Sequence, residues 1–306
     1  MHRRALSPGS GRRISSAVQV FDETIRDAVI DRLLALEKHF EGDVIFYYGP
    51  IDPSLTRVFR DFLERLATAK GKRERLVFFV NTNGGSAEAA EKMVEIARFH
   101  YREVFFVVPD FAMSAGTILC MAGDKIFMDY SSSLGPIDPQ VFNGKDWVPA
   151  LGYLDKVEQL LAKARSGELT NAEFLILQNQ DLATLSRYEQ ARDLTVSLLR
   201  KWLVEFKFRD WTHHRSDPDK KGAVVTVDQK KARAEQVAHA LNDNKRWHSH
   251  SRMIGLQALR AEVGLEIDDY SNDVERQRLV RSYNDLLTEY VARHGQNFFM
   301  HSREHF

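Results

Sequence analysis

Residues 75–101, RLVFFVNTNGGSAEAAEKMVEIARFHY, hold the pattern that decides the fold. The stretch opens on a continuous apolar run, which predicts a buried strand over residues 75–83. It then spaces its apolar side chains as an amphipathic helix does, and this helix follows Gly84 and Gly85 directly. Glycines permit backbone conformations that other residues avoid, and they let a ligand approach the main chain. The stretch therefore predicts a strand, a tight turn and a helix over residues 86–101.

The same alternation of strand and helix continues on both sides of this stretch. Apolar runs predict further strands over residues 43–51, 103–109 and 125–130, and helical spacing predicts helices over 22–40, 54–70 and 114–123. Because each strand is apolar throughout, we expect an α/β fold with βαβ units and a mainly parallel sheet covered on both faces. Beyond residue 150 the pattern becomes largely helical, with helices predicted over residues 151–166, 171–208, 227–241, 251–263 and 272–293.

These patterns divide the chain into four parts. Residues 1–16 are rich in Arg, Ser and Gly and are predicted to form a disordered basic arm. Residues 17–150 are predicted to form the α/β core. Residues 151–295 are predicted to form a helical extension that packs on the core or projects from it, and residues 296–306 a tail.

Composition excludes several classes of protein. Lys and Arg together number 43, as do Asp and Glu, so no net charge draws the chain to nucleic acid or to an anionic membrane. The single cysteine, Cys120, excludes an intramolecular disulfide framework and a thiolate metal cluster. The apolar runs fall short of the roughly 20 residues of a membrane helix, and no apolar signal core follows the basic start. We therefore expect a soluble cytoplasmic protein without a metal or other cofactor.

A second strand-to-helix turn, VVPDFAMSAGT (107–117), carries a candidate nucleophile. Ser114 would lie in the first turn of a helix, where the helix dipole and free N–H groups stabilise negative charge. Ser114 follows Gly85 by 29 residues, with one helix and one strand between them. In a right-handed βαβ crossover both turns emerge at the carboxyl edge of adjacent strands, so one turn can supply an oxyanion donor to the nucleophile of the other. An ordinary loop and a serine that only caps its helix are the alternatives.

The two turns together resemble the Clp-fold serine peptidases. NTNGGSAEAAEKMVEIAR and FAMSAGTILCMAGDKIFM are similar to the motifs of this superfamily, which includes the Clp proteolytic subunit and signal peptide peptidase A. The resemblance implies a ClpP/crotonase-like fold with Ser114 as the nucleophile. It also implies that the N–H groups of Gly85 and Ala115 form the oxyanion hole. An extended peptide substrate would then pair with the edge at Gly84 and Ser86.

This chain lacks the nearby histidine base of one branch of that superfamily, and no motif in it marks the lysine base of another. The Clp proteolytic subunit has a histidine soon after its serine, but this chain has none between His100 and His213. Signal peptide peptidase A uses a lysine instead. Lys125, Lys156 and Lys163 are candidates for that role, and no local motif selects one of them.

A third branch, the serine dehydrogenase proteinase family, fits the later motifs better. SSSLGPIDPQ (131–140) resembles the segment that carries the acid of this family, which makes Asp138 the acid. Pro136 and Pro139 would hold that carboxylate rigidly, as an orienting group requires.

The histidine of such a triad would come from the helical half of the chain. RWHSHSRMIGLQALRAEVGL (246–265) resembles the late segment of the same family, and its register selects His250 as the base, with His248 as the near alternative. His213 and His214 belong to a polar loop and are further alternatives.

These motifs predict a serine endopeptidase that hydrolyses peptide bonds by a Ser nucleophile assisted by Asp and His. The alternatives are a Ser-Lys dyad peptidase, an inactive Clp-fold scaffold or binding module, and a crotonase-like acyl-CoA enzyme. The resemblance further implies a peptide or unfolded-protein substrate and a homo-oligomer. Because the chain has no P-loop, an ATPase or other regulatory partner would have to unfold folded substrates.

Overall fold

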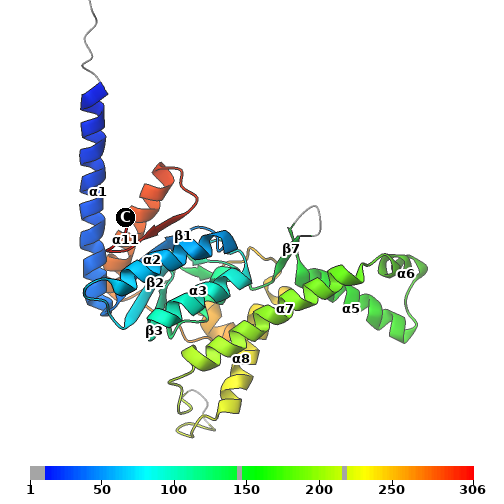
Figure 1. The fold of residues 1–306 in the computed structure, drawn as a ribbon. Coiled ribbons are helices and arrows are strands. Elements are labelled where there is room, and N and C mark those ends of the chain that lie inside the picture. The colour runs from blue at the N-terminus through cyan, green and yellow to red at the C-terminus, as the bar shows by residue number, and fades with distance from the viewer. Residues whose placement is uncertain (1–10, 143–146, 216–218) are drawn as a thin grey trace, which may run out of the picture.

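The apolar runs of the sequence form one central sheet in the computed structural model, which describes residues 11–142, 147–215 and 219–306 (Figure 1). Its strands lie in the order β10-β5-β3-β2-β1-β11. All are parallel except β11, which is antiparallel to β1. Their bounds are β1 (Asp43–Tyr48), β2 (Arg75–Asn81), β3 (Glu103–Val107), β5 (Lys125–Met128), β10 (Asp268–Asp269) and β11 (Phe299–His301). This is the parallel α/β sheet that the sequence predicts.

Helices cover both faces of the sheet, because alternate side chains of each strand point to opposite sides. On one face pack helices α2 (Thr56–Thr68), α3 (Ala87–His100) and α4 (Ala115–Cys120), and the ring of Phe78 stacks between Phe59 at 5.7 Å and Phe106 at 5.2 Å. On the other face pack α1 (Gly11–Phe40) and α11 (Val274–Arg293), and Phe79 meets Tyr283 edge-on at 5.3 Å.

A second, three-stranded sheet lies at the carboxyl end of the first. Strand β4 (Phe111–Ala112) pairs in parallel with β6 (Ser133–Leu134), and β6 pairs antiparallel with β9 (Ile254–Gly255). A parallel bridge between Thr82 and Ala112 attaches this small sheet to the segment that follows β2. The sequence analysis missed it because strands of two residues leave no periodic signal.

The second half of the chain is mainly helical, as predicted. Helices α5 (Ala150–Ser166), α6 (Asn171–Gln178) and α7 (Leu182–Trp202) extend away from the central sheet, and α8 (Val227–Leu241) packs beside α7 (Figure 1). The predicted helix over 171–208 breaks at residues 179–181, where Asp181 caps the following helix by accepting hydrogen bonds from two backbone N–H groups. The elements of this half are β7 (Gln140–Phe142), β8 (Trp147–Pro149), α5 (Ala150–Ser166), α6 (Asn171–Gln178), α7 (Leu182–Trp202), a π-helix (Leu203–Lys207), α8 (Val227–Leu241), α9 (Asn244–Trp247), α10 (Leu256–Ala258) and a second π-helix (Leu259–Val263).

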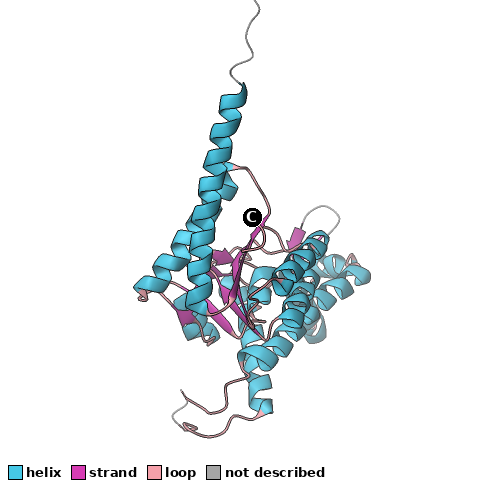
Figure 2. Cartoon of the chain, turned by 60° about the vertical axis from the view of Figure 1, so that its left-hand side comes forward, coloured by secondary structure: helices cyan, strands magenta, loops and turns pink. Residues whose placement is uncertain are grey.

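Both ends of the chain differ from the predicted arm and tail. Residues 11–16, assigned to the arm, form the first turns of α1, which extends well beyond the rest of the protein (Figure 2). Residues 1–10 lie outside the described residues. The predicted tail contains β11, whose pairing with β1 closes one edge of the central sheet. Within the described ranges, none of the helices combines the length and the apolarity needed to span a bilayer.

Candidate active site

The turn after β2 holds two glycines in conformations that favour glycine. Gly84 has a φ of +105° and Gly85 a φ of +149°. The N–H of Ile51 donates to the carbonyl of Gly84 at 2.9 Å, and the N–H of Ser86 donates to the carbonyl of Ile51 at 2.8 Å. A Cβ on Gly85 would lie only 2.0 Å from the Ile51 oxygen. Between these bonds the N–H of Gly85 has no hydrogen-bond acceptor in the described part of the chain.

Ser114 occupies a strained backbone conformation at the head of α4. Its φ of 52° and ψ of −117° lie outside the regions that residues other than glycine normally adopt. Its side chain makes no capping hydrogen bond, so the structure does not support the interpretation as a simple cap. Ser114 is 9% exposed, and the N–H of the next residue, Ala115, has no acceptor among the described residues. The hydroxyl and this N–H are therefore both available to a ligand.

Backbone hydrogen bonds hold the serine turn against the glycine turn. The N–H of Thr82 donates to the carbonyl of Phe111 at 3.1 Å, and the N–H of Met113 donates to the carbonyl of Thr82 at 2.9 Å. The helix head can approach this closely because residue 116 is glycine: a Cβ there would lie 2.4 Å from Cγ2 of Thr82.

Gly84 lies directly against the serine. A Cβ on Gly84 would lie 2.7 Å from Cβ of Ser114 and 3.2 Å from the backbone nitrogen of Ala115. Gly84, and with it the turn that carries the N–H of Gly85, thus packs against the backbone of Ser114 and Ala115. Two N–H donors suit the oxyanion that forms when a hydroxyl attacks a carbonyl.

A buried chain of amides links the strand ends that precede the two turns. Asn81 donates through Nδ2 to Oδ1 of Asn284 at 2.7 Å, and Asn284 donates through Nδ2 to Oδ2 of Asp110 at 2.9 Å. Asn81 and Asn284 are 2% and 1% exposed. Helix α11 therefore braces both turns, and no local motif around Asn284 indicates this.

Asp138 is buried in the loop after β6. It is 2% exposed, and its Oδ1 accepts the Leu151 N–H at 3.1 Å, whereas its Oδ2 is buried without a partner in the described structure. Burial raises the pKa of the Asp138 carboxyl to about 6, the Leu151 hydrogen bond opposes the rise, and the charge of Asp155 adds to it.

Thr117 fixes this loop to the helix head. Its buried hydroxyl donates to the carbonyl of Ala112 at 2.8 Å and accepts the Gly135 N–H at 2.9 Å. One side chain thereby ties the serine turn to the segment that leads to Asp138. The sequence analysis missed Thr117 because it lies in an apolar run that reads as core.

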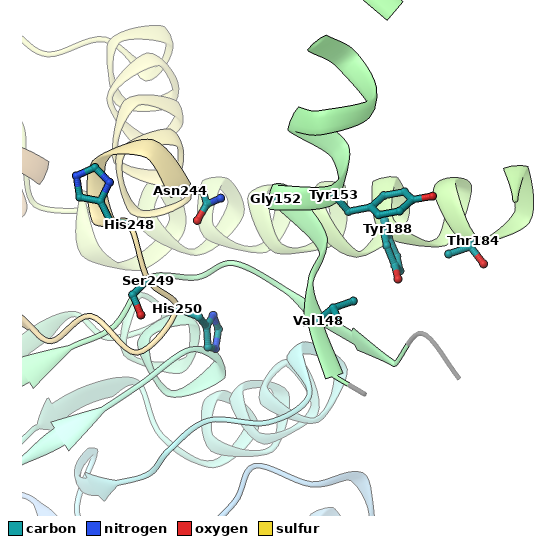
Figure 3. Close-up of a pocket in the computed structure, with 9 residues that line it drawn as sticks. All are labelled: Val148, Gly152, Tyr153, Thr184, Tyr188, Asn244, His248, Ser249 and His250. Atoms are coloured by element: carbon teal, nitrogen blue, oxygen red, sulfur yellow. The ribbon is translucent and has the colours of Figure 1, made fainter. Parts of the chain in front are cut away.

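His250 precedes β9 and faces a pocket (Figure 3). Its Nδ1 is buried and has no hydrogen-bond partner among the described residues. Burial lowers the pKa of the imidazole below its ordinary value of 6.5, so the ring is neutral at neutral pH, as a general base must be.

The small sheet brings the segments of these three residues to one end. Ser114 lies beyond the carboxyl end of β4 and Asp138 beyond that of the parallel strand β6. His250 lies before the amino end of β9, which is antiparallel to β6 and therefore points the other way. No hydrogen bond joins the three side chains in the described structure.

Comparison with known protein families agrees with this geometry. The chain matches the family described as ClpP-like SDH-type serine proteinase over residues 44–217, more than half of its length. The chain belongs to this SDH-type family. The match spans the glycine turn, the serine turn and the Asp138 loop, and it ends before His250.

Two relatives of this SDH-type chain come from Methanocaldococcus jannaschii. The uncharacterized protein MJ0137 is 30% identical over 184 residues, which cover 57% of this chain and 60% of that protein. The uncharacterized protein MJ1495 is 31% identical over 111 residues, which cover 36% of this chain and 35% of that protein. Each alignment covers less than two thirds of the relative.

Two solved structures show a more distant likeness to the SDH-type chain, and both are of the 1510-N membrane-bound stomatin-specific protease. A serine-to-alanine mutant has a TM-score of 0.29 and 18% identity, with 39% of this chain and 61% of that chain covered. A lysine-to-alanine mutant in complex with a substrate peptide has a TM-score of 0.30 and 20% identity, with 38% and 56% covered.

The lysines considered for a Ser-Lys dyad lie apart from this site. Lys125 opens β5, at the amino edge of the sheet, whereas Ser114 lies at the carboxyl edge. It forms an ion pair with Asp268 at 3.5 Å. Lys163 pairs with Glu173 at 2.5 Å, and Lys156 is exposed on α5.

The other candidate histidines occupy different places. His213 and His214 lie beside a short bridge between His213 and Val224, in the connection before α8. His248 is exposed and ends α9 in a left-handed conformation, with a φ of 61°. His248 lines the same pocket as His250, so it stays an alternative base.

The edge expected to bind a peptide is partly occupied. The carbonyl of Gly84 and the N–H of Ser86 both bond to Ile51, so these groups are not open to a substrate strand, contrary to the prediction for Gly84 and Ser86. The hydroxyl of Ser86 caps α3 by accepting the Ala89 N–H at 3.0 Å. Gly85 alone keeps its N–H free on this segment.

Proposed function

We propose that this protein is a serine endopeptidase in which Ser114 attacks the carbonyl carbon of a peptide bond. Nε2 of His250 takes the hydroxyl proton as the Ser114 oxygen bonds to that carbon. The carbonyl electron pair moves to the oxygen, where the N–H groups of Gly85 and Ala115 stabilise it. His250 then protonates the leaving amine as the C–N bond breaks, and water releases the acyl group by the reverse sequence. Asp138 orients the imidazole and stabilises its charge.

One observation carries this assignment. Oδ2 of Asp138 and Nδ1 of His250 are both buried without hydrogen-bond partners. A buried polar atom without a partner costs free energy, so each is expected to have a use in a functional state. A carboxylate oxygen accepts and an imidazole N–H donates, and this is the bond that joins acid to base in a Ser-His-Asp triad.

A serine-directed fluorophosphonate probe tests the nucleophile. We expect the wild type to be labelled and mass spectrometry to place the adduct on Ser114. Ser114→Ala abolishes labelling and peptide hydrolysis, whereas Ser197→Ala, at an exposed serine on α7, leaves both unchanged. Undiminished labelling of Ser114→Ala would overturn the assignment.

The base is tested separately. His250→Ala should lower the labelling rate by about 10³-fold, as expected for a triad member. Lys156→Ala should leave it unchanged, because Lys156 is exposed on α5. The reverse result would replace the triad with a Ser-Lys dyad.

An inactive scaffold is the second candidate, and the missing hydrogen bonds among Ser114, Asp138 and His250 favour it. It predicts that a folded wild type reacts with the probe no faster than Ser114→Ala does.

Assembly is part of the proposal. Exposed apolar side chains on α6, namely Phe174, Leu175 and Ile176, are 52–57% exposed and support a homo-oligomer. Mass photometry of the wild type and of Leu175→Lys tests this, since a monomeric wild type would exclude it. We propose peptides or unfolded proteins as substrates, with an ATPase or regulatory partner for folded ones, in the cytoplasm.

A further inference from the structure

A pocket of about 760 Å³ opens between α5, α7 and α9 (Figure 3). Its walls come from segments far apart in the chain: β8 and the start of α5, the first half of α7, and α9 with the loop that follows it. The lining residues are Val148, Gly152, Tyr153, Thr184, Tyr188, Asn244, His248, Ser249 and His250.

The pocket contacts one of the proposed catalytic groups, His250, and borders the helix turn that binds another, Asp138. His250 forms part of its wall, and Figure 3 shows His250 and Val148 on the same side of the pocket. Gly152 lines the pocket, and the residue before it, Leu151, donates its N–H to Asp138. The first turn of α5 therefore holds the acid on one side and borders the pocket on the other. A molecule in the pocket would contact His250 and lie one residue away from the N–H that binds Asp138.

The lining selects for uncharged ligands. Among the described residues that line the pocket, none is Asp, Glu, Lys or Arg. The rings of Tyr153 and Tyr188 meet edge-on at 4.8 Å and form an aromatic wall. A buried charged group would find no Asp, Glu, Lys or Arg among these lining residues to pair with, which disfavours charged side chains. The amide of Asn244 and the hydroxyl of Ser249 remain as hydrogen-bonding groups for an amide backbone.

The pocket is large enough for more than one side chain. A cavity of about 150 Å³ already accommodates a benzene-sized ring. Ligand sites usually measure about 300–1,000 Å³, and this pocket of about 760 Å³ falls within that range. It has room for an aromatic side chain together with adjoining backbone.

We propose that this pocket, which includes His250, binds a segment of the peptide substrate and selects large aromatic or aliphatic side chains over charged ones. The proposal rests on the peptidase function proposed above and adds its substrate class. It assigns a specificity role to Gly152, Tyr153 and Tyr188.

Gly152 provides the sharpest perturbation. A Cβ there would lie 3.4 Å from Nδ2 of Asn244, an ordinary van der Waals distance, so a side chain can be added without a backbone clash. Gly152→Leu should fold and place its branched end in the pocket. Ala164→Leu is the matched control, because it adds similar bulk at an exposed position on the same helix.

Binding is measured on Ser114→Ala, where no turnover intervenes. The probes are fluorescein-labelled hexapeptides that differ at one central position, which is Phe, Leu, Asp or Lys, and fluorescence anisotropy reports affinity. We expect the Phe and Leu peptides to bind at least about tenfold more tightly than the charged ones, as a matched apolar pocket allows. Gly152→Leu removes this preference, and Ala164→Leu keeps it.

Equal affinity for all four peptides, no binding of any, or a preference that Gly152→Leu does not change would each overturn the pocket assignment. Melting curves establish that both leucine variants are folded. The two proposals fail in different ways. Selective binding without fluorophosphonate labelling of the wild type upholds the pocket and overturns the peptidase, and labelling without selective binding does the reverse.

Discussion

Replacing Gly84 by alanine tests the close contact between the two turns. In Gly84→Ala the new Cβ would lie 2.7 Å from both the Met113 carbonyl oxygen and Cβ of Ser114. Contacts between such atoms are normally about 3.5–4.0 Å, so the serine turn must move by about 1 Å. The φ of +105° adds backbone strain for any residue with a Cβ.

Gly71→Ala separates these two effects. Gly71 has a φ of +83°, but a Cβ there would meet nothing within 4 Å. The free energy of unfolding of Gly71→Ala should therefore fall only by the cost of the backbone strain, about 1–2 kcal/mol. The free energy of unfolding of Gly84→Ala should fall by a further ~1–3 kcal/mol because of overpacking, which makes a total loss of about 2–5 kcal/mol. Urea unfolding of the two variants gives the difference.

The labelling rate measures the functional consequence. A misplacement of about 1 Å at a reacting centre costs on the order of 10²-fold in rate. We expect fluorophosphonate to label Gly84→Ala about 100-fold more slowly than the wild type and Gly71→Ala at the wild-type rate. If folded Gly84→Ala is labelled as fast as Gly71→Ala, Gly84 does not position the serine turn and the reasoning is refuted.

Three further predictions concern buried charges. Arg303→Met should lower the free energy of unfolding by about 3–5 kcal/mol, because Arg303 lies 2.7 Å from each of two buried carboxylates, on Glu37 and Asp43. Asp138→Asn should abolish labelling yet raise the free energy of unfolding at pH 8 by about 2–3 kcal/mol. The folded pKa of Asp138 is about 6 against 3.8 when solvated, so burial destabilises the fold increasingly from pH 4 to 6 and fully above pH 6. The wild-type labelling rate should fall as His250 gains a proton, with a midpoint below pH 6.5 because burial lowers its pKa.

Each of these three has a result that contradicts it. Arg278→Met, at an exposed position on α11, is the control for Arg303, and equal losses in the two variants would show that the buried pairing contributes nothing. An Asp138→Asn variant less stable than the wild type at pH 8 would show that the carboxylate has a partner. A labelling midpoint above pH 6.5 would contradict the unpaired His250 of this structure and show that a carboxylate such as Asp138 already pairs with it in the free protein.

Most of the fold could be predicted from the sequence, because its elements are long and periodic. Strands β1, β2 and β3 each carry an apolar run, and each is followed or preceded by an amphipathic helix. Of the strands that were missed, β4, β6, β9 and β10 have only two residues each, and β7 and β8 only three. Pairing across the chain creates the two-residue strands, and no local pattern encodes such pairing. Strand β11 was missed for a related reason, since its three residues lie near the end of the chain, where a tail is the default expectation.

The candidate site divides in the same way. Roles for Gly85, Ser114 and Ala115 could be suggested from the sequence, because each belongs to a turn with its own chemistry, and these roles stay predictions. The positions of Thr117 and Asn284 beside the site could not be predicted, because each depends on hydrogen bonds to residues distant in the chain.

The hydrophobic core crosses the predicted boundary at residue 150, since Trp202 and Leu241 pack in the same cluster as Phe78. The second half also contacts the segments of the candidate site. Asn284 on α11 bonds to Asn81 and Asp110 beside the two turns, and β9, which follows His250, pairs with a strand of the first half. We therefore expect that loosening the second half would disturb the glycine and serine turns, even though their motifs lie entirely in the first half. Two short motifs can thus suggest a chemistry, while the contacts that would position it come from the rest of the chain.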